Sequence, residues 1–169
     1  MNFIRAYAIE AVKHVLLLGL IFAAVYAGNS FSCTRVDPGF TYMRPRVDEN
    51  AILLVDRRPA RDGELQIEDV VCYTFTFPER IATRVGRVIA LPGETFEAKA
   101  GSFIIDRRAR HTAAIDGIKQ YTIPPIMVPR GHLLVMFDRS FGNQPLIDKQ
   151  LVPFSEILGR VVYSIGGGK

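Results

Sequence analysis

The chain has 169 residues, of which 49% are hydrophobic and 22% are charged, so it is long enough for one domain with a core and an additional segment. The net charge is +4, and the arginines are scattered among acidic residues, which excludes the basic stripe of a nucleic-acid-binding face. The two cysteines lack CxxC spacing and the histidines do not cluster, so we expect no metal and no cofactor. Cys33 and Cys72 either pair outside the cytoplasm or stay as buried free thiols; both alternatives are open.

The N-terminal segment is predicted to be a membrane anchor. Residues 15–34 are 20 residues without a charge, and a helix of that length crosses about 30 Å. Before them, apolar residues recur at helical spacing among charged ones, which predicts an amphipathic start in the headgroup region. The competing interpretation is a signal peptide cleaved after Val25-Tyr26-Ala27. Tyr26 and Phe31 are typical of interfacial aromatics flanking a span and favour an uncleaved anchor.

The sequence predicts three parts: an anchor over residues 1–34, a β domain over 35–165 with a small insertion at 98–123, and a flexible tail at 166–169. Arg5 and Lys13 favour an N-terminus on the inside of the membrane. We therefore expect a single-pass protein of the inner (cytoplasmic) membrane. Its C-terminal domain would lie on the periplasmic or extracytoplasmic side.

The β domain is indicated by short apolar runs, rich in β-branched and aromatic residues and broken by Gly, Pro and Asp. The expected strands cover residues 51–55, 69–75, 84–91, 102–105, 132–137 and 159–165. This spacing predicts a mainly β, antiparallel barrel or coiled sheet, with no long helix after the anchor. The apolar run 123–128 is either a buried extended segment or an exposed docking edge, and its two prolines favour a sheet edge in both cases.

Five segments in chain order carry a family resemblance. Residues 87–94, Arg-Val-Ile-Ala-Leu-Pro-Gly-Glu, form a strand that ends in a Leu-Pro-Gly-acid turn. The other segments are Tyr42-Met43-Arg44-Pro45, residues 69–73, residues 128–136 and residues 152–160. Together they resemble the type I signal peptidases over most of residues 40–162. The resemblance implies a signal-peptidase-like β domain that follows one N-terminal transmembrane helix.

The resemblance also implies a catalytic pair that this chain lacks. The family has a serine nucleophile at the start of Ser-Met-x-Pro and a lysine base before the Arg-Val-Ile strand. Serine needs a base to take its proton, and lysine serves only when burial lowers its pKa. Tyr42 and Gly86 stand at these two positions. The flanking Arg84 and Arg87 cannot substitute, because a guanidinium stays protonated.

The leading hypothesis is therefore a catalytically inactive accessory, structural or assembly subunit of a membrane protein complex. The expected partners are that complex or an extended peptide segment, together with the bilayer around residues 15–34. Candidate partner-binding residues are Tyr42, Met43, Pro45, Arg84, Arg87 and Leu91. The alternative is an active signal peptidase or conjugation-transfer endopeptidase with a displaced nucleophile, Thr41 or Ser102.

Overall fold

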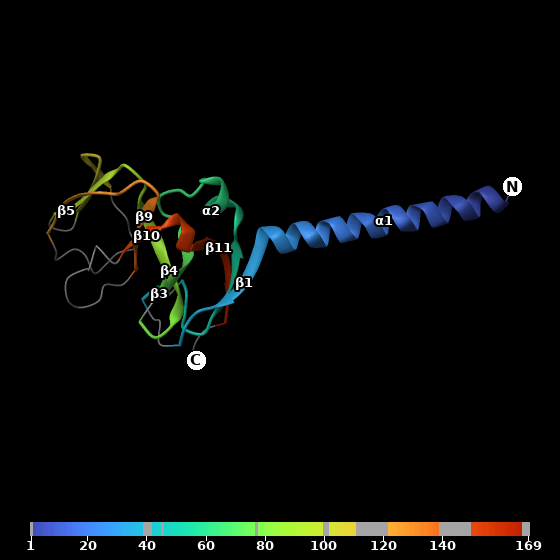
Figure 1. The fold of residues 1–169 in the computed structure, drawn as a ribbon, viewed down its shortest axis with the longest axis horizontal. Coiled ribbons are helices and arrows are strands. Elements are labelled where there is room, and N and C mark those ends of the chain that lie inside the picture. The colour runs from blue at the N-terminus through green and yellow to red at the C-terminus, as the bar shows by residue number, and fades with distance from the viewer. Residues whose placement is uncertain are drawn as a thin grey trace.

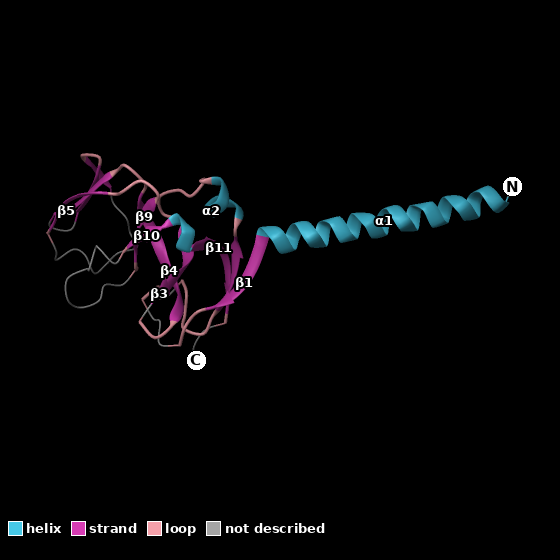
Figure 2. Cartoon of the chain, in the orientation of Figure 1, coloured by secondary structure: helices cyan, strands magenta, loops and turns pink. Residues whose placement is uncertain are grey.

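A long helix projects from one end of a β domain in the computed structural model (Figure 1). The structure describes residues 2–38, 42–44, 46–76, 78–99, 102–110, 122–138 and 150–166. The elements are α1 (Asn2–Ser30), β1 (Phe31–Arg35), β2 (Ile52–Asp56), α2 (Arg58–Asp62), β3 (Val70–Thr76), β4 (Ile81–Ala90), β5 (Thr95–Lys99), β6 (Ser102–Ile105), β7 (Arg108–Arg110), β8 (Ile123–Met127), β9 (His132–Met136), β10 (Leu151–Pro153), η3 (Phe154–Glu156) and β11 (Ile157–Ile165). Figure 2 shows that strands dominate the domain, which confirms the predicted mainly β fold with one N-terminal helix.

The N-terminal helix is long and apolar enough to cross a membrane. Its stretch Val12–Ser30 has a mean hydropathy of 1.5, and residues 12–29 are all exposed, so only Ser30 at its end is buried against the domain. The helix ends at Ser30, four residues before the end predicted for the anchor. Residues 31–34 belong instead to β1, where Phe31 pairs with Asp56 and Arg35 pairs with Ile52. A run of uncharged residues is compatible with an edge strand as well as with a membrane-spanning helix. The composition alone therefore placed the end of the anchor too late.

The strands form two antiparallel sheets. The larger sheet has seven strands in the order β1-β2-β11-β3-β4-β9-β10, and the smaller has four in the order β7-β6-β5-β8. The pairings of β11 with β2 and β3, and of β4 with β9, each contain a register shift. Such irregularities increase the local twist of a sheet. The result is a curled antiparallel sheet, as the sequence predicts.

The buried side chains form three clusters. One lies between the two sheets and includes Phe96 and Phe103, whose ring centroids are 5.6 Å apart. A second gathers Met43, Val85 and Phe137 beside the segment that follows β1. The third covers the other side of β3 and β4 and contains Tyr73, Val88 and Val135. These last two clusters surround the positions at which the family resemblance places a nucleophile and a base.

The smaller sheet bears on two details of the sequence analysis. Its strands include Thr95–Lys99 and Ile123–Met127, at the two ends of the insertion predicted at 98–123, and that insertion stays a prediction. In β8, Ile123 is buried, whereas Pro124, Pro125 and Met127 are exposed. The prediction of a buried segment is therefore wrong for most of this strand, because β8 lies at a sheet edge. The edge position expected of its prolines is confirmed.

Candidate functional site

Tyr42, at the position of the family nucleophile, packs into the domain. Its ring lies on the ring of Phe137, with centroids 5.6 Å apart and planes at 31°. The next residue, Met43, is fully buried, and its sulfur accepts a hydrogen bond from the backbone N–H of Asp138 at 3.3 Å. Thr41 and Pro45 lie outside the described residues. Tyr42 is thus held by an aromatic contact on one side and a buried neighbour on the other.

Gly86, at the position of the family base, has no room for a side chain. It lies inside β4, and an added Cβ would be 2.4 Å from Cγ1 of Val135, a distance at which something must move. The same Cβ would lie 3.2 Å from the carbonyl oxygen of Met136 and 3.6 Å from the ring of Tyr73. Burial also raises the pKa of the Tyr73 phenol above its usual value, so this ring stays neutral. The place of a lysine stem is therefore filled by apolar atoms.

Tyr42 and Gly86 face different clusters of the core. Tyr42 packs on Phe137, which belongs to the cluster of Met43 and Val85. A Cβ at Gly86 would instead meet Val135 and Tyr73, whose cluster covers the other side of β3 and β4. Both family positions are therefore surrounded by apolar and aromatic side chains, each on its own side of the sheet.

Arg87, the residue after Gly86, is occupied inside the domain. Its side chain is 2% exposed, and its Nε and Nη2 donate to the two carboxylate oxygens of Asp138 at 2.8 and 2.7 Å. Its Nη1 donates to the backbone carbonyl of Glu68 at 3.0 Å. A buried guanidinium needs such partners, because an unpaired buried charge is very costly. Arg87 and Met43 are therefore not at the surface, where the predicted partner would meet them.

The remaining candidate residues reach the surface. Arg84 is half-buried, and its guanidinium lies over the ring of Phe75 at 4.6 Å from the centroid. Leu91 is half-buried, and its N–H donates to the carboxylate of Glu94 at 2.6 Å, which closes the Leu-Pro-Gly-acid turn. Gly93 adopts a φ of 85° in that turn, a conformation that glycine favours. Among the predicted residues that the structure describes, Tyr42, Arg84 and Leu91 remain partly accessible.

Ser102, one of the two alternative nucleophiles, lies in the other sheet. It pairs with Lys99 across β5 and β6, so a serine and a lysine are neighbours there. The Lys99 side chain is 61% exposed and forms an ion pair with Glu97. A lysine acts as a base when it is buried away from carboxylates, and Lys99 is in the opposite situation.

The two cysteines do not meet in the structure: Cys33 is exposed on β1, and Cys72 is a buried free thiol in β3. The interpretation as two buried thiols is thus correct for Cys72 and wrong for Cys33. Burial raises the pKa of the Cys72 thiol to about 12. Among the described residues, no group of three or more His, Cys, Asp or Glu side chains could hold a metal ion.

Sequence reasoning missed the partners that fill the site. Val135 and Tyr73 were expected only as strand residues, and Asp138 only as the residue after the strand predicted at 132–137. A usable signal exists for Asp138. Asp138 directly follows one apolar strand, and Arg87 lies within another. A charge in a buried strand needs an opposite charge or hydrogen-bonding partner, so an acid and a base in two such strands are candidates for a pair.

Comparisons with known proteins show the family of this chain. The family model described as "Signal peptidase, peptidase S26" matches residues 9–164, which is most of the chain. The chain belongs to this family, which confirms the resemblance read from the five segments.

The individual relatives are more distant. Over 129 residues the chain is 26% identical to a probable signal peptidase I-1 of Synechocystis sp., a match that covers 72% of this chain and 65% of the relative. The chain therefore spans just under two thirds of that protein's length. A crystal structure of a signal peptidase I from Enterococcus faecalis V583 shares 17% identity over 57% of this chain and 95% of the other, with a TM-score of 0.43.

Proposed function

We propose that this protein is a non-catalytic member of the signal peptidase family that binds an extended segment of a partner within a membrane protein complex. It is anchored in the inner membrane by α1, with its β domain on the extracytoplasmic side. The single observation that carries the proposal is the filled space at Gly86, where Val135 and Tyr73 occupy the place of a base.

The aromatic contact at Tyr42 supports the same conclusion. The Tyr42 ring packs on the ring of Phe137. Arg87, the residue after Gly86, donates to a carboxylate and a carbonyl and cannot accept a proton. The two positions therefore contribute packing to the fold rather than a proton-transfer pair.

Binding without cleavage fits the half-buried candidate residues. Tyr42, Arg84 and Leu91 are each partly accessible and comprise two largely apolar side chains and one cation. An extended peptide held by backbone hydrogen bonds and side-chain pockets would use such a surface. Because Tyr42 and Gly86 replace the family nucleophile and base, such a peptide would remain bound.

Co-purification tests the proposal most directly. The full tagged chain is extracted from native membranes in mild detergent, with a photo-crosslinking amino acid at Leu91 in one sample and at the exposed Glu64 in a control. We expect a stoichiometric larger assembly and a crosslinked chain from position 91 alone. A lone particle near 18.9 kDa plus detergent, with no crosslink, would argue against a subunit role.

A cleavage assay tests the second candidate, an active endopeptidase, in which Ser102 and its cross-strand neighbour Lys99 would have to act despite the exposure of Lys99. The substrate is a peptide with small residues at the minus-three and minus-one positions. The proposal predicts no cleavage above a denatured control. Cleavage abolished by both Ser102→Ala and Lys99→Gln would establish the second candidate instead. Cleavage abolished by Thr41→Val would point to the other displaced nucleophile.

A further inference from the structure

Strand β1 lies at one end of the larger sheet and turns part of its backbone away from β2. The carbonyl of Ser30 and the N–H of Val36, just before and just after the strand, both bond toward β2. Hydrogen bonding alternates along an antiparallel strand, so Phe31, Cys33 and Arg35 direct their N–H and C=O groups to the other side. Among the described strands, none lies beside these outward groups, which we call the β1 edge.

The β1 edge lacks the features that usually keep the edge of a sheet unpaired. Proteins protect such edges with prolines, lysines, bulges or very short strands. Strand β1 has five residues, Phe-Ser-Cys-Thr-Arg, and pairs with β2 without a register shift. At the opposite edge of the same sheet, β10 has three residues and ends at Pro153. The β1 edge is therefore suited to pairing with another strand.

A second copy of the same edge fits this strand. In an antiparallel pairing centred on Cys33, the two Cys33 residues oppose each other, and Phe31 of each copy opposes Arg35 of the other. All three outward residues then exchange hydrogen bonds, whereas a centre one residue away leaves one of them outside the pairing. The two Arg35 side chains lie at opposite ends of the paired strands. Like charges therefore do not face each other, and each cation lies beside an aromatic ring.

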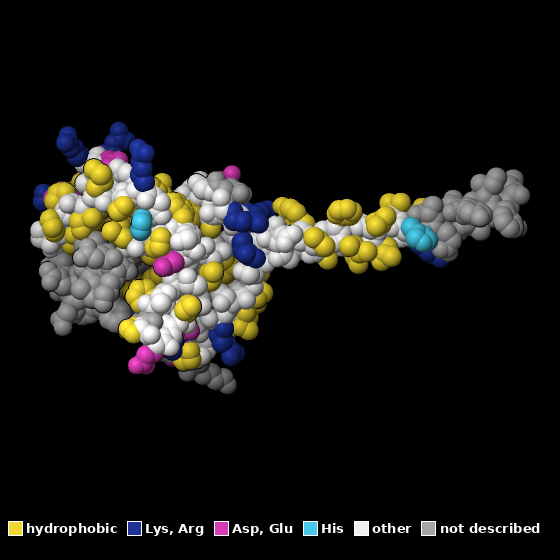
Figure 3. Space-filling model, viewed as in Figure 1, with side chains coloured by type: hydrophobic (Ala, Val, Ile, Leu, Met, Phe, Trp, Pro, Cys, Tyr) yellow, Lys and Arg dark blue, Asp and Glu magenta, His cyan; other side chains and the backbone are white. Residues whose placement is uncertain are grey.

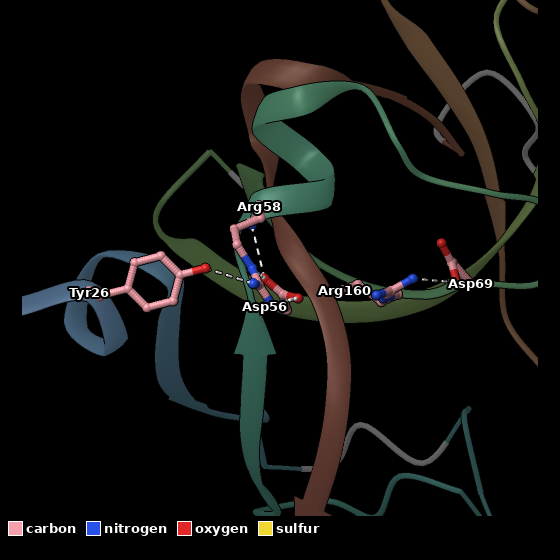
Figure 4. Close-up of polar contacts among 5 residues, drawn as sticks. All are labelled: Tyr26, Asp56, Arg58, Asp69 and Arg160. Carbon is pink, nitrogen blue, oxygen red and sulfur yellow. Dashed lines mark hydrogen bonds and ion pairs between the residues drawn. The ribbon is translucent and has the colours of Figure 1, made fainter. Parts of the chain in front are cut away.

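The anchor helix leaves the sheet from one face rather than along β1. Asp56 and Phe31 oppose each other in β2 and β1, so their side chains share that face. Arg58 donates to the Asp56 carboxylate at 2.9 and 2.8 Å, and its Nη1 donates to the phenolic oxygen of Tyr26 in α1 at 3.1 Å (Figure 4). Its guanidinium also lies 5.1 Å from the ring centroid of Phe31. These contacts hold α1 across the direction of β1, as Figure 1 shows.

This direction of α1 lets two paired copies share one membrane. The two-fold axis of an antiparallel strand pair is perpendicular to the sheet, so it leaves both helices on the same side of the joined sheet. Figure 3 shows hydrophobic side chains along the projecting helix, clear of the domain, where a bilayer can surround both helices. A helix that continued along β1 would instead point in opposite directions in the two copies.

We propose that two copies of this chain pair antiparallel along their β1 edges, with the two-fold axis between the two Cys33 residues. The pairing joins two seven-stranded sheets into one continuous sheet. Insertion of every copy into one membrane raises the effective concentration of the matching edge. The inference goes beyond the proposed function and uses no residue of the Tyr42 site, so either can fail alone.

Disulfide trapping of the full chain in native membranes tests the pairing. Opposed residues of such a pair have Cα atoms about 5.5 Å apart, within the range that a disulfide bridges. Diamide oxidises the two thiols and takes up the electrons and protons that they lose. Cys33 is exposed, whereas Cys72 is buried with a raised pKa and stays unreactive. The control is Met127→Cys in a Cys33→Ser background, because Met127 is 69% exposed in the smaller sheet.

We expect Cys33 to give several-fold more disulfide-linked homodimer than position 127. In the Cys33→Ser background, a mixture of Phe31→Cys and Arg35→Cys chains should crosslink, whereas either variant alone should not. Identical positions at either end of the strand would lie roughly 14 Å apart, which a disulfide cannot span. Equal yields at 33 and 127, or a bond from Cys33 to a different protein, would overturn the proposal. So would equal crosslinking of Phe31→Cys alone and in the mixture, because the register would then be wrong.

Proline substitution tests the backbone of the β1 edge. The N–H of Cys33 points away from β2, so Cys33→Pro removes an outward donor and leaves the hydrogen bonds between β1 and β2 in place. Light scattering in mild detergent should give twice the chain mass of 18.9 kDa for Cys33→Ser and the single mass for Cys33→Pro. Circular dichroism checks that both variants fold, and Arg35→Pro, whose N–H points the same way, replaces Cys33→Pro if that variant misfolds. A monomeric Cys33→Ser protein, or a dimer that survives proline, would refute the pairing.

Discussion

Gly86→Ala should destabilise the protein, although alanine normally favours a strand more than glycine does. Alanine in place of glycine usually stabilises by about 0.5–1 kcal/mol. Here its methyl group would lie 2.4 Å from Cγ1 of Val135, a buried and branched side chain, and 3.2 Å from a backbone carbonyl. Overpacking a well-filled core costs about 1–3 kcal/mol. Because neither neighbour is a flexible chain end, we expect the upper part of that range and a net loss of about 2 kcal/mol.

The reference background is Val135→Ala, which removes the atom that clashes. Alone it should cost about 2 kcal/mol through lost burial and a cavity. In that background Gly86→Ala should become neutral or stabilising, so the two changes couple by about 2–3 kcal/mol. Chemical and thermal unfolding of the four variants in one detergent measures the cycle. A loss of 2 kcal/mol lowers Tm by about 4–8 °C in a chain of this size.

The clash at Gly86 would be refuted if Gly86→Ala had the same effect on the free energy of unfolding with and without Val135→Ala. If Gly86→Ala leaves the free energy of unfolding unchanged in both backgrounds, then the position has room for a side chain. The argument that the place of a catalytic base is filled would then fail, and so would the main support for a non-catalytic function.

Three further outcomes follow from the buried and titratable groups. Arg87→Met leaves a buried carboxylate unpaired and should cost about 3–5 kcal/mol in urea unfolding; an unchanged midpoint would contradict this pairing. Arg58 holds the pKa of Asp56 below its usual value. The ionised Asp56 therefore stabilises the fold at neutral pH, and this stabilisation is lost as the pH falls through the pKa of Asp56 in the folded state. Arg58→Ala should therefore shift acid unfolding, followed by circular dichroism, to higher pH; no shift would exclude the effect. At pH 8 a thiol reagent should modify Cys33 alone in the native protein, and Cys72 only after denaturation, because its pKa is raised to about 12.

The sequence predicts a strand correctly where the residues on either side of it mark its ends. The strand at 102–105 was predicted residue for residue, because a short apolar run is bounded there by Gly101 and Asp106. The strand at 31–35 was missed, because its uncharged residues continue the composition of the helix before it. Strand pairing, rather than composition, ends the helix at Ser30.

The site is predictable only in part. The family segments identify Tyr42 and Gly86 as the changed positions. They do not reveal that Val135 fills the space beside Gly86, since that contact joins β4 to β9 across the sheet. The pair of Arg87 and Asp138 spans 51 residues of sequence and equally escapes a local pattern. Packing between distant strands, which decides whether a base could fit, has to be seen in three dimensions.

The two prolines of β8 have a consequence for how a partner would attach. A free sheet edge accepts a foreign strand only if its backbone N–H groups can donate, and Pro124 and Pro125 have none. Strand addition at the β8 edge of the smaller sheet is therefore disfavoured, because the prolines remove a donor from that edge. A partner that extends this protein by a strand is directed away from β8, for example to the seven-stranded sheet, whose edges are β1 and β10. Crosslinking groups placed along β1 and β10 would detect such a partner strand.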